Sequence, residues 1–438
     1  MKATCVSVLA AWATLMGNVI ASAAESEPAP DARFAPYSAD PDHPWNKLHR
    51  ALFVRELGGR RLIHKTDPLL YRGGTFLFAG ESYRQAITAL DQFLAKPADP
   101  PINDPLKQLF LQRDLWAAFD YAAWYPDDWV LKSEYEPGAI AIRFRVAKAM
   151  AALRLNEREL VALPDNYSLA VKSREYAADY DREHPERPFL PADLFDPKGP
   201  WVRFHETSFG AKPMTAKHFD GAGGRAAHIV FLRLPGGRAV TEDYLKNLTP
   251  EPPLLEHVQR LSAKQFPEGT MVAMVRRALA IDQKTKVRLT PLTELVQIRV
   301  YRRIPQEAEA NFQGDFGEQD VYEFILDRAK LFAGEPGLQA VGRDDPAEPQ
   351  FDRSEMSNPF ERDNQFAPRM PQLKTCIQCH QGPGIYSLIS MERGLGKNLK
   401  GSRENFRTFA WDVEVNYTVR AKVQQYNWGM LQGMLEAK

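Results

Sequence analysis

The chain has 438 residues, and its 56 Lys and Arg balance 56 Asp and Glu, so the formal net charge is zero at neutral pH. This balance gives no general electrostatic signal for binding nucleic acid or an anionic membrane. The length and the 44% hydrophobic content predict a globular protein of about two or three domains, which is too large for one small electron carrier.

The N-terminus has the pattern of an export signal. Lys2 precedes an apolar run from Val6 to Met16, and Ala21-Ser22-Ala23 offers the small residues of a cleavage site. We therefore predict a signal peptide over residues 1–23, which also removes Cys5. No later run approaches the roughly 18 apolar residues that a membrane span needs. The expected product is soluble, periplasmic or secreted, with no transmembrane segment after signal removal.

A Pro- and Asp-rich stretch over residues 24–45 predicts a flexible lead-in, and a helical domain is expected over residues 46–198. Apolar residues recur at helical spacing in three segments, and Asp104 followed by Pro105 is typical of a helix start. The predicted helices are Glu81–Ala95, Asp104–Trp124 and Gly138–Leu155.

A β-rich domain is predicted over residues 199–343, with a turn at Gly236-Gly237. The predicted strands are His228–Leu232, Met271–Ala280, Leu295–Tyr301 and Tyr322–Leu326. Met271–Ala280 partly alternates apolar and basic residues. A linker over residues 344–374 leads to a mainly helical C-terminal segment, residues 375–438, with one long helix at Tyr417–Leu435. The expected fold class is therefore α+β.

The C-terminal segment contains the sequence Cys376-Ile377-Gln378-Cys379-His380. Two thiols separated by two residues can bond to the vinyl groups along one edge of a porphyrin, and the adjacent imidazole can then reach the iron. The spacing predicts one covalently attached c-type haem, with Cys376 and Cys379 as its attachment points and His380 as an iron ligand.

Other interpretations of this motif are a short-range disulfide, a redox-active dithiol or half of a zinc site. A zinc site needs two more ligands, and the sequence has no second cysteine pair and no close histidine pair. A thioredoxin-like dithiol would sit between a strand and a helix, whereas Pro371 precedes this motif and Gly382-Pro383-Gly384 follows it.

The motif resembles the attachment site of the c-type cytochromes, and Gly396 to Gly401 faintly resembles the Gly-Pro-Asn-Leu stretch of the small class I members, with Lys397 where they have proline. The resemblance covers less than a tenth of the chain. It implies an exported monohaem cytochrome that transfers single electrons to or from a redox partner protein or a small donor or acceptor. The alternatives are a haem enzyme with an open distal site, which is peroxidase-like, and a haem-based sensor or binding protein.

A second iron ligand is left open by the sequence, and no catalytic residue is assigned. An empty distal face would favour small-molecule chemistry, whereas a Met or His ligand would favour electron transfer. The candidates are Met391, Met430, Met434, Met356, Met370, His205, His218 and His228, and the i, i+4 spacing of Met430 and Met434 is also typical of core packing.

Overall fold

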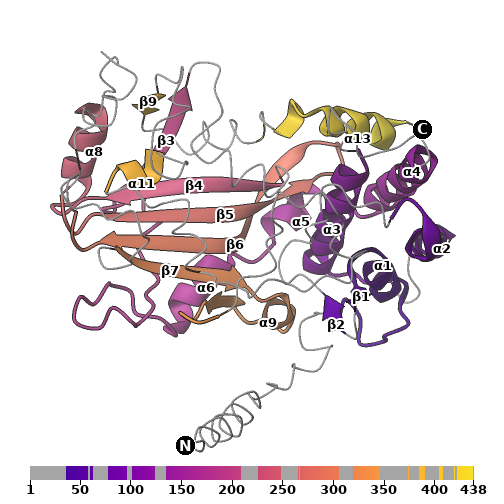
Figure 1. Cartoon of the computed structure of the whole chain (residues 1–438), viewed down its shortest axis with the longest axis horizontal. Coiled ribbons are helices and arrows are strands. Elements are labelled where there is room, and N and C mark those ends of the chain that lie inside the picture. Colours follow the sequence, from indigo (N-terminus) through magenta and orange to yellow (C-terminus); the bar gives the residue numbers. More distant parts are fainter. Residues whose placement is uncertain are drawn as a thin grey trace, which may run out of the picture.

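A computed structural model gives the structure of most of the chain between residues 36 and 437. It describes residues 36–57, 60–62, 77–95, 101–123, 135–208, 225–247, 265, 267–304, 319–345, 373, 384–389, 404–407, 419 and 422–437. Within these ranges a group of helices lies beside a large antiparallel sheet, so the fold is α+β as predicted (Figure 1).

The helical group comes mainly from the first part of the chain. It consists of α1 (Pro44–Phe53), α2 (Gly80–Ala95), α3 (Pro105–Ala123), α4 (Glu136–Ala152), α5 (Glu157–Val161) and α6 (Asn166–Ser173), with a short hairpin of β1 (Arg55–Leu57) and β2 (Arg60–Leu62). The three helices expected from periodicity are confirmed as α2, α3 and α4. Asp104 caps α3, because its carboxylate accepts the N–H of Leu106 at 2.9 Å.

Helix α3 is the centre of this group. It packs against α1, α4 and β5, and its residues from Leu109 to Ala123 are all buried. A helix that is buried on every side must pair each polar side chain internally, since water does not reach it. Four buried polar residues of α3 do so through contacts with distant parts of the chain: Gln112, Arg113, Asp114 and Asp120.

The sheet has seven strands in the order β8-β7-β6-β5-β4-β3-β9, and all neighbouring strands are antiparallel. Its members are β3 (Val202–Ser208), β4 (Ala226–Arg233), β5 (Met271–Ile281), β6 (Val287–Tyr301), β7 (Gln319–Leu326), β8 (Leu338–Ala340) and β9 (Glu404–Arg407). The four predicted strands are confirmed as β4 to β7. The predicted turn is also confirmed, since Gly236 and Gly237 have φ angles of 95° and 84°.

A bulge interrupts the long β5–β6 ladder. The register shifts between Arg276 and Leu279, and Pro291 lies on the opposite strand at this point. Proline cannot donate to a ladder, so a bulge is where a strand tolerates it. Beyond the bulge the β5–β6 hairpin packs on the helical group, with Leu279 and Leu292 in the core that it shares with α1 to α4.

The two faces of the sheet differ. One face is apolar and is covered by α6 and by residues 176–201, with Phe231, Val296 and Phe324 in its core. Short helices lie at one end of the other face. These are α8 (Arg238–Asn247) and α11 (Tyr386–Ile389), while α9 (Arg328–Phe332) follows β7 (Figure 1).

Two expectations for the chain ends need correction. The C-terminal helix α13 (Tyr426–Glu436) is shorter than predicted, because Gln425 has extended backbone angles and ends any continuous helix from Tyr417. The end of the expected lead-in is fixed by contacts, since the buried Tyr37 hydroxyl donates to Asp114 at 2.6 Å. No described helix is long and apolar enough to cross a membrane.

Candidate functional site

The C-x-x-C-H motif is framed by two described stretches of chain. The motif residues Cys376, Cys379 and His380 lie outside the described residues, as do His218, Met356, Met370 and Met391. Leu373 precedes the motif and residues 384–389 follow it, and both are described. The contacts of these two flanks therefore show where the chain is held before and after the motif.

The preceding flank is held against strand β7. Leu373 is buried and packs against Val321 of β7 and the partly buried Val341. It also lines a pocket of about 500 Å³ together with Arg302 and Asp320. This contact is apolar, so it holds the chain by burial of hydrophobic surface.

The following flank begins at a glycine where a larger residue would displace the side chain of Gln265. Gly384 has a φ of +52°, and a Cβ there would lie 2.1 Å from Gln265 Oε1. The same oxygen accepts the N–H of Ile385 at 2.7 Å. Gln265 thus fixes the backbone at the point where the chain leaves the motif.

Helix α11 then docks on the sheet. Ile385 and Leu388 are buried in an apolar cluster with residues of α8, β4 and β5. The hydroxyls of Ser387 and Tyr301 are hydrogen-bonded to each other, and Ser387 Oγ also donates to the carbonyl of Gly384 at 2.8 Å. Burial raises the pKa of Tyr301, so its hydroxyl stays protonated in this contact.

Both flanks contact the same face of the sheet at neighbouring positions. Tyr301 pairs with Gln319 across β6 and β7, and Val321 is two residues beyond Gln319 on the same face. Such diagonal neighbours lie about 7–8 Å apart. Arg299 lies directly opposite Val321 and two residues before Tyr301, so it is between the two flanks.

The sheet face that the flanks contact is rich in buried polar groups. We call the following side chains the polar face, since strand register puts them on one side of β4 to β7: His228, Met274, Arg276, Gln297, Arg299 and Glu323. Five of the six are at least nine-tenths buried, and Arg276 is only slightly more exposed. Buried polar groups at this density are typical of a functional surface rather than of a plain core.

The polar face holds two arginines and one carboxylate, Glu323, and one of the arginines has a further acidic partner. Arg276 Nε lies 3.3 Å from Glu294 Oε2, and Arg113 of α3 binds the other oxygen of the same carboxylate. Arg299 Nη2 donates to Gln297 Oε1 at 3.0 Å, whereas Nη1 is buried and meets no hydrogen-bond partner among the described residues. A buried guanidinium N–H of this kind is suited to an anionic acceptor.

A second buried network fixes the C-terminal part of the chain to the helical group. Asp120 of α3 accepts from Arg225 at 2.8 Å, from Lys422 at 3.0 Å and from Asn427 at 2.5 Å. Lys422 is fully buried, and its ammonium lies 4.9 Å from the ring centre of Trp116. These contacts are structural, since they join α13 to α3.

The described candidates for an iron ligand differ in their position relative to the two flanks. Met430 and Met434 of α13 are partly buried against the core of the helical group. Figure 1 shows α13 and α11 at opposite ends of the sheet. His205 is described only as backbone, in register with Arg407. His228, on the polar face, is the described candidate on the same sheet face as the flanks.

Another group of titratable residues lies between α1, α3 and α9. Arg328 donates to both oxygens of Asp114 at 2.7 and 2.8 Å, and His49 Nε2 lies 3.7 Å from Asp114. Burial lowers the pKa of His49 to about 4 and raises that of Tyr37 well above its usual range. This group is enclosed in the core, which indicates a structural role.

The described residues contain no cluster of three or more His, Cys, Asp or Glu side chains that could hold a metal ion. No protein-family model matches the chain, and no similar protein was found among curated proteins or solved structures.

The polar face was not identified from the sequence, apart from His228. Its signal is the alternation in Leu295–Tyr301, where Gln297 and Arg299 alternate with apolar residues, while in Met271–Ala280 Arg276 alone is polar on this face. Alternation of this kind usually predicts a face in contact with water. Here that face is buried, and no local pattern distinguishes the two cases.

Proposed function

We propose that the protein is an exported, monohaem c-type cytochrome that transfers single electrons to or from a redox partner. The observation that carries the proposal is the C-x-x-C-H motif between two flanks that contact one spot on a buried polar sheet face. The signal pattern at the N-terminus supports export, because covalent haem is attached outside the bacterial cytoplasm.

Chain geometry supports a haem beside the polar face. Consecutive residues span at most about 3.6 Å each, so Cys376 is within about 11 Å of Leu373 and His380 is within about 14 Å of Gly384. Leu373 and Gly384 belong to the flanks that contact the sheet on either side of Arg299. A group bonded to both cysteines therefore stays close to this part of the sheet.

The side chains present fit a haem. Arg299 is the cation best suited to a carboxylate at the edge of the macrocycle, because its buried Nη1 has no acceptor among the described residues, whereas Arg276 is paired with Glu294. Met274, Val321 and Leu295 offer apolar contact from the same face. When bound, the haem supplies an iron that cycles between its ferrous and ferric states.

The roles of the protein follow from these contacts. Cys376, Cys379 and His380 would hold the group, and Arg299 would add a positive charge that favours the reduced state. The buried sheet face excludes water and thereby lowers the dielectric response around the site. His228 or Met274 is suited by chemistry to a second ligand position.

One observation favours a second candidate function, a haem enzyme with an open distal site. Such an enzyme needs a base and a cation near the iron, and His228 lies directly opposite Arg276 in the β4–β5 register. In that case the imidazole would accept a proton from a bound small molecule such as peroxide, and the guanidinium would stabilise developing negative charge.

An optical spectrum of protein exported with the haem-attachment machinery tests both candidates. We expect covalent haem in the native protein and none in the variant Cys376→Ala/Cys379→Ala, while Cys5→Ser, the third cysteine of the chain, keeps it. Protein without covalent haem would contradict both candidates. A reduced spectrum unchanged by carbon monoxide indicates a saturated electron carrier, whereas a shifted spectrum followed by peroxide turnover indicates the enzyme.

A further inference from the structure

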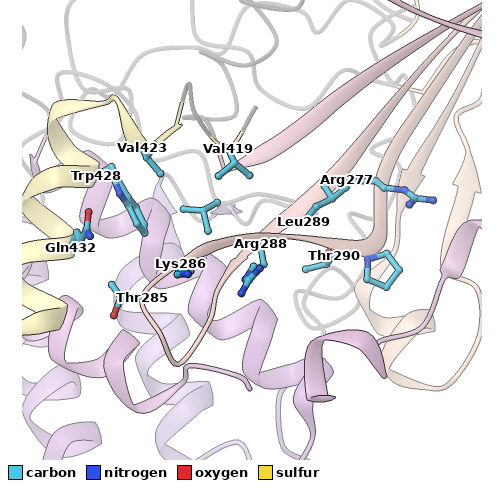
Figure 2. Close-up of a pocket in the computed structure, with 12 residues that line it drawn as sticks. Arg277, Thr285, Lys286, Arg288, Leu289, Thr290, Val419, Val423, Trp428 and Gln432 are labelled. Atoms are coloured by element: carbon cyan, nitrogen blue, oxygen red, sulfur yellow. The ribbon is translucent and has the colours of Figure 1, made fainter. Parts of the chain in front are cut away.

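A pocket of about 780 Å³ lies between the β5–β6 hairpin and the C-terminal part of the chain (Figure 2). Its volume is within the range of about 300–1,000 Å³ that is typical of small-molecule sites. The described residues that line it are Arg277, Thr285, Lys286, Val287, Arg288, Leu289, Thr290, Pro291, Val419, Val423, Trp428 and Gln432.

The pocket is cationic. Its lining contains Arg277, Lys286 and Arg288, and none of the described lining residues is acidic. Arg288 is held in place by the buried Asp282, whose Oδ2 lies 2.7 Å from the guanidinium Nε. Arg277 stacks over Phe195 at 4.3 Å, and Figure 2 shows its guanidinium on the side away from Trp428. Lys286 is exposed and is the cation best placed to meet an incoming anion.

The opposite wall is apolar and aromatic. Val419, Val423 and Trp428 come from the C-terminal part of the chain and face the hairpin across the pocket (Figure 2). Val423 is 41% exposed, which is high for a valine. Trp428 is buried and packs in a tilted arrangement against Trp116, with ring centres 5.6 Å apart, so this part of the wall is fixed by packing. A ligand that binds here meets a cation on one side and apolar surface on the other.

We propose that this pocket binds a small organic anion with an aromatic or aliphatic body. The acidic group contacts Lys286, with Arg288 adding to the positive field, and the body packs against Val419 and Val423. The site goes beyond the proposed electron transfer, since it lies at the Val287 end of β6 and the motif flanks contact the Tyr301 end. A strand of this length places the two ends about 45 Å apart.

Fluorescence titration of the full-length, haem-loaded protein with an aromatic sulfonate tests the site. The probe is 8-anilinonaphthalene-1-sulfonate, and its uncharged counterpart is N-phenyl-1-naphthylamine. We expect Lys286→Glu to weaken sulfonate binding about five- to tenfold and to change binding of the neutral probe less than about twofold. The matched control is Lys284→Glu, an exposed lysine of the same hairpin outside the pocket, which should leave both affinities unchanged.

A second variant tests the apolar wall. Val423→Trp fills the pocket and should weaken both probes at least about tenfold. If Val423→Trp alters the far-ultraviolet circular dichroism spectrum, the variant Gln432→Glu takes its place. A carboxylate in the pocket lining should weaken binding of the sulfonate probe and leave binding of the neutral probe unchanged. The proposal is overturned if Lys286→Glu and Lys284→Glu bind the sulfonate equally, or if binding survives in folded Val423→Trp.

Discussion

Arg299 is the residue of the sheet that we expect to have most influence on the proposed haem. It lies on the polar face between Tyr301 and Val321, the two residues that hold the flanks. In the proposed cytochrome, a unit charge about 10–15 Å from the iron, in a medium of effective dielectric about 20, would be worth roughly 1–2 kcal/mol. The positive charge of Arg299 would then stabilise the reduced state relative to the oxidised state.

We therefore expect Arg299→Gln to lower the midpoint potential by roughly 40–90 mV, measured by spectroelectrochemical titration. The matched control is Arg233→Gln, because Arg233 lies on the opposite face of β4, over the ring of Trp201 at 5.9 Å. Equal shifts in the two variants would contradict a haem beside the polar face, as would an unchanged potential in Arg299→Gln.

His49 makes stability depend on pH. Its folded pKa of about 4 is below the usual 6.5, because burial disfavours the imidazolium. Between these values the unfolded chain takes up a proton that the folded protein does not, so the free energy of unfolding falls as pH falls from about 6.5 to 4. Urea unfolding at pH 7.5 and at pH 4.5 measures how much the free energy of unfolding falls on acidification. We expect this decrease to be about 2–3 kcal/mol smaller in His49→Gln than in the native protein.

The exposed His184 supplies the control for this measurement, since its side chain is about half exposed. The variant His184→Gln should keep the full loss of stability on acidification. If His49→Gln loses as much stability as the native protein, then His49 is not the group responsible.

At the scale of elements, α3 joins the sheet to the end of the chain through Asp120. Removing this charge leaves Lys422 and Arg225, which are both buried, without their carboxylate. We expect Asp120→Asn to lower the free energy of unfolding by about 3–5 kcal/mol in urea titration. Asp91→Asn, which removes a surface pair with Arg145, should cost less than about 1 kcal/mol, and similar losses would contradict the role of α3.

The sequence predicted the elements better than their environments. Periodicity located α2, α3 and α4, because an apolar stripe is a local property. The same helix α3 carries Asp114 and Asp120 in its buried part, and their partners Arg328 and Lys422 are 214 and 302 positions away. No local pattern contains this information. The C-terminal helix was predicted too long, because the helical periodicity from Tyr417 gives no sign of the extended backbone at Gln425. The contact of Lys422 with Asp120 beside this break is again distant in sequence.

At the scale of the whole molecule, the helical group and the sheet share one core. Leu279 and Leu292 of the β5–β6 hairpin pack in the same cluster as Leu115 of α3 and Leu431 of α13. The bulge at Pro291 separates the part of the hairpin that enters this core from the part that carries the polar face. The two candidate sites therefore lie on one continuous strand, β6, but in different surroundings.

The position of the two flanks would also set an order of events during export of the proposed cytochrome. The residues that receive them, Gln265, Tyr301 and Val321, all precede the motif in the chain, by as many as 120 positions for the contact between Gln265 and Ile385. In an exported chain they would leave the channel first, so that β3 to β8 would be able to pair before the cysteines emerge, whereas β9 follows the motif. In the proposed cytochrome, docking of α11 would then compete with attachment of the haem, because both involve the chain next to the motif.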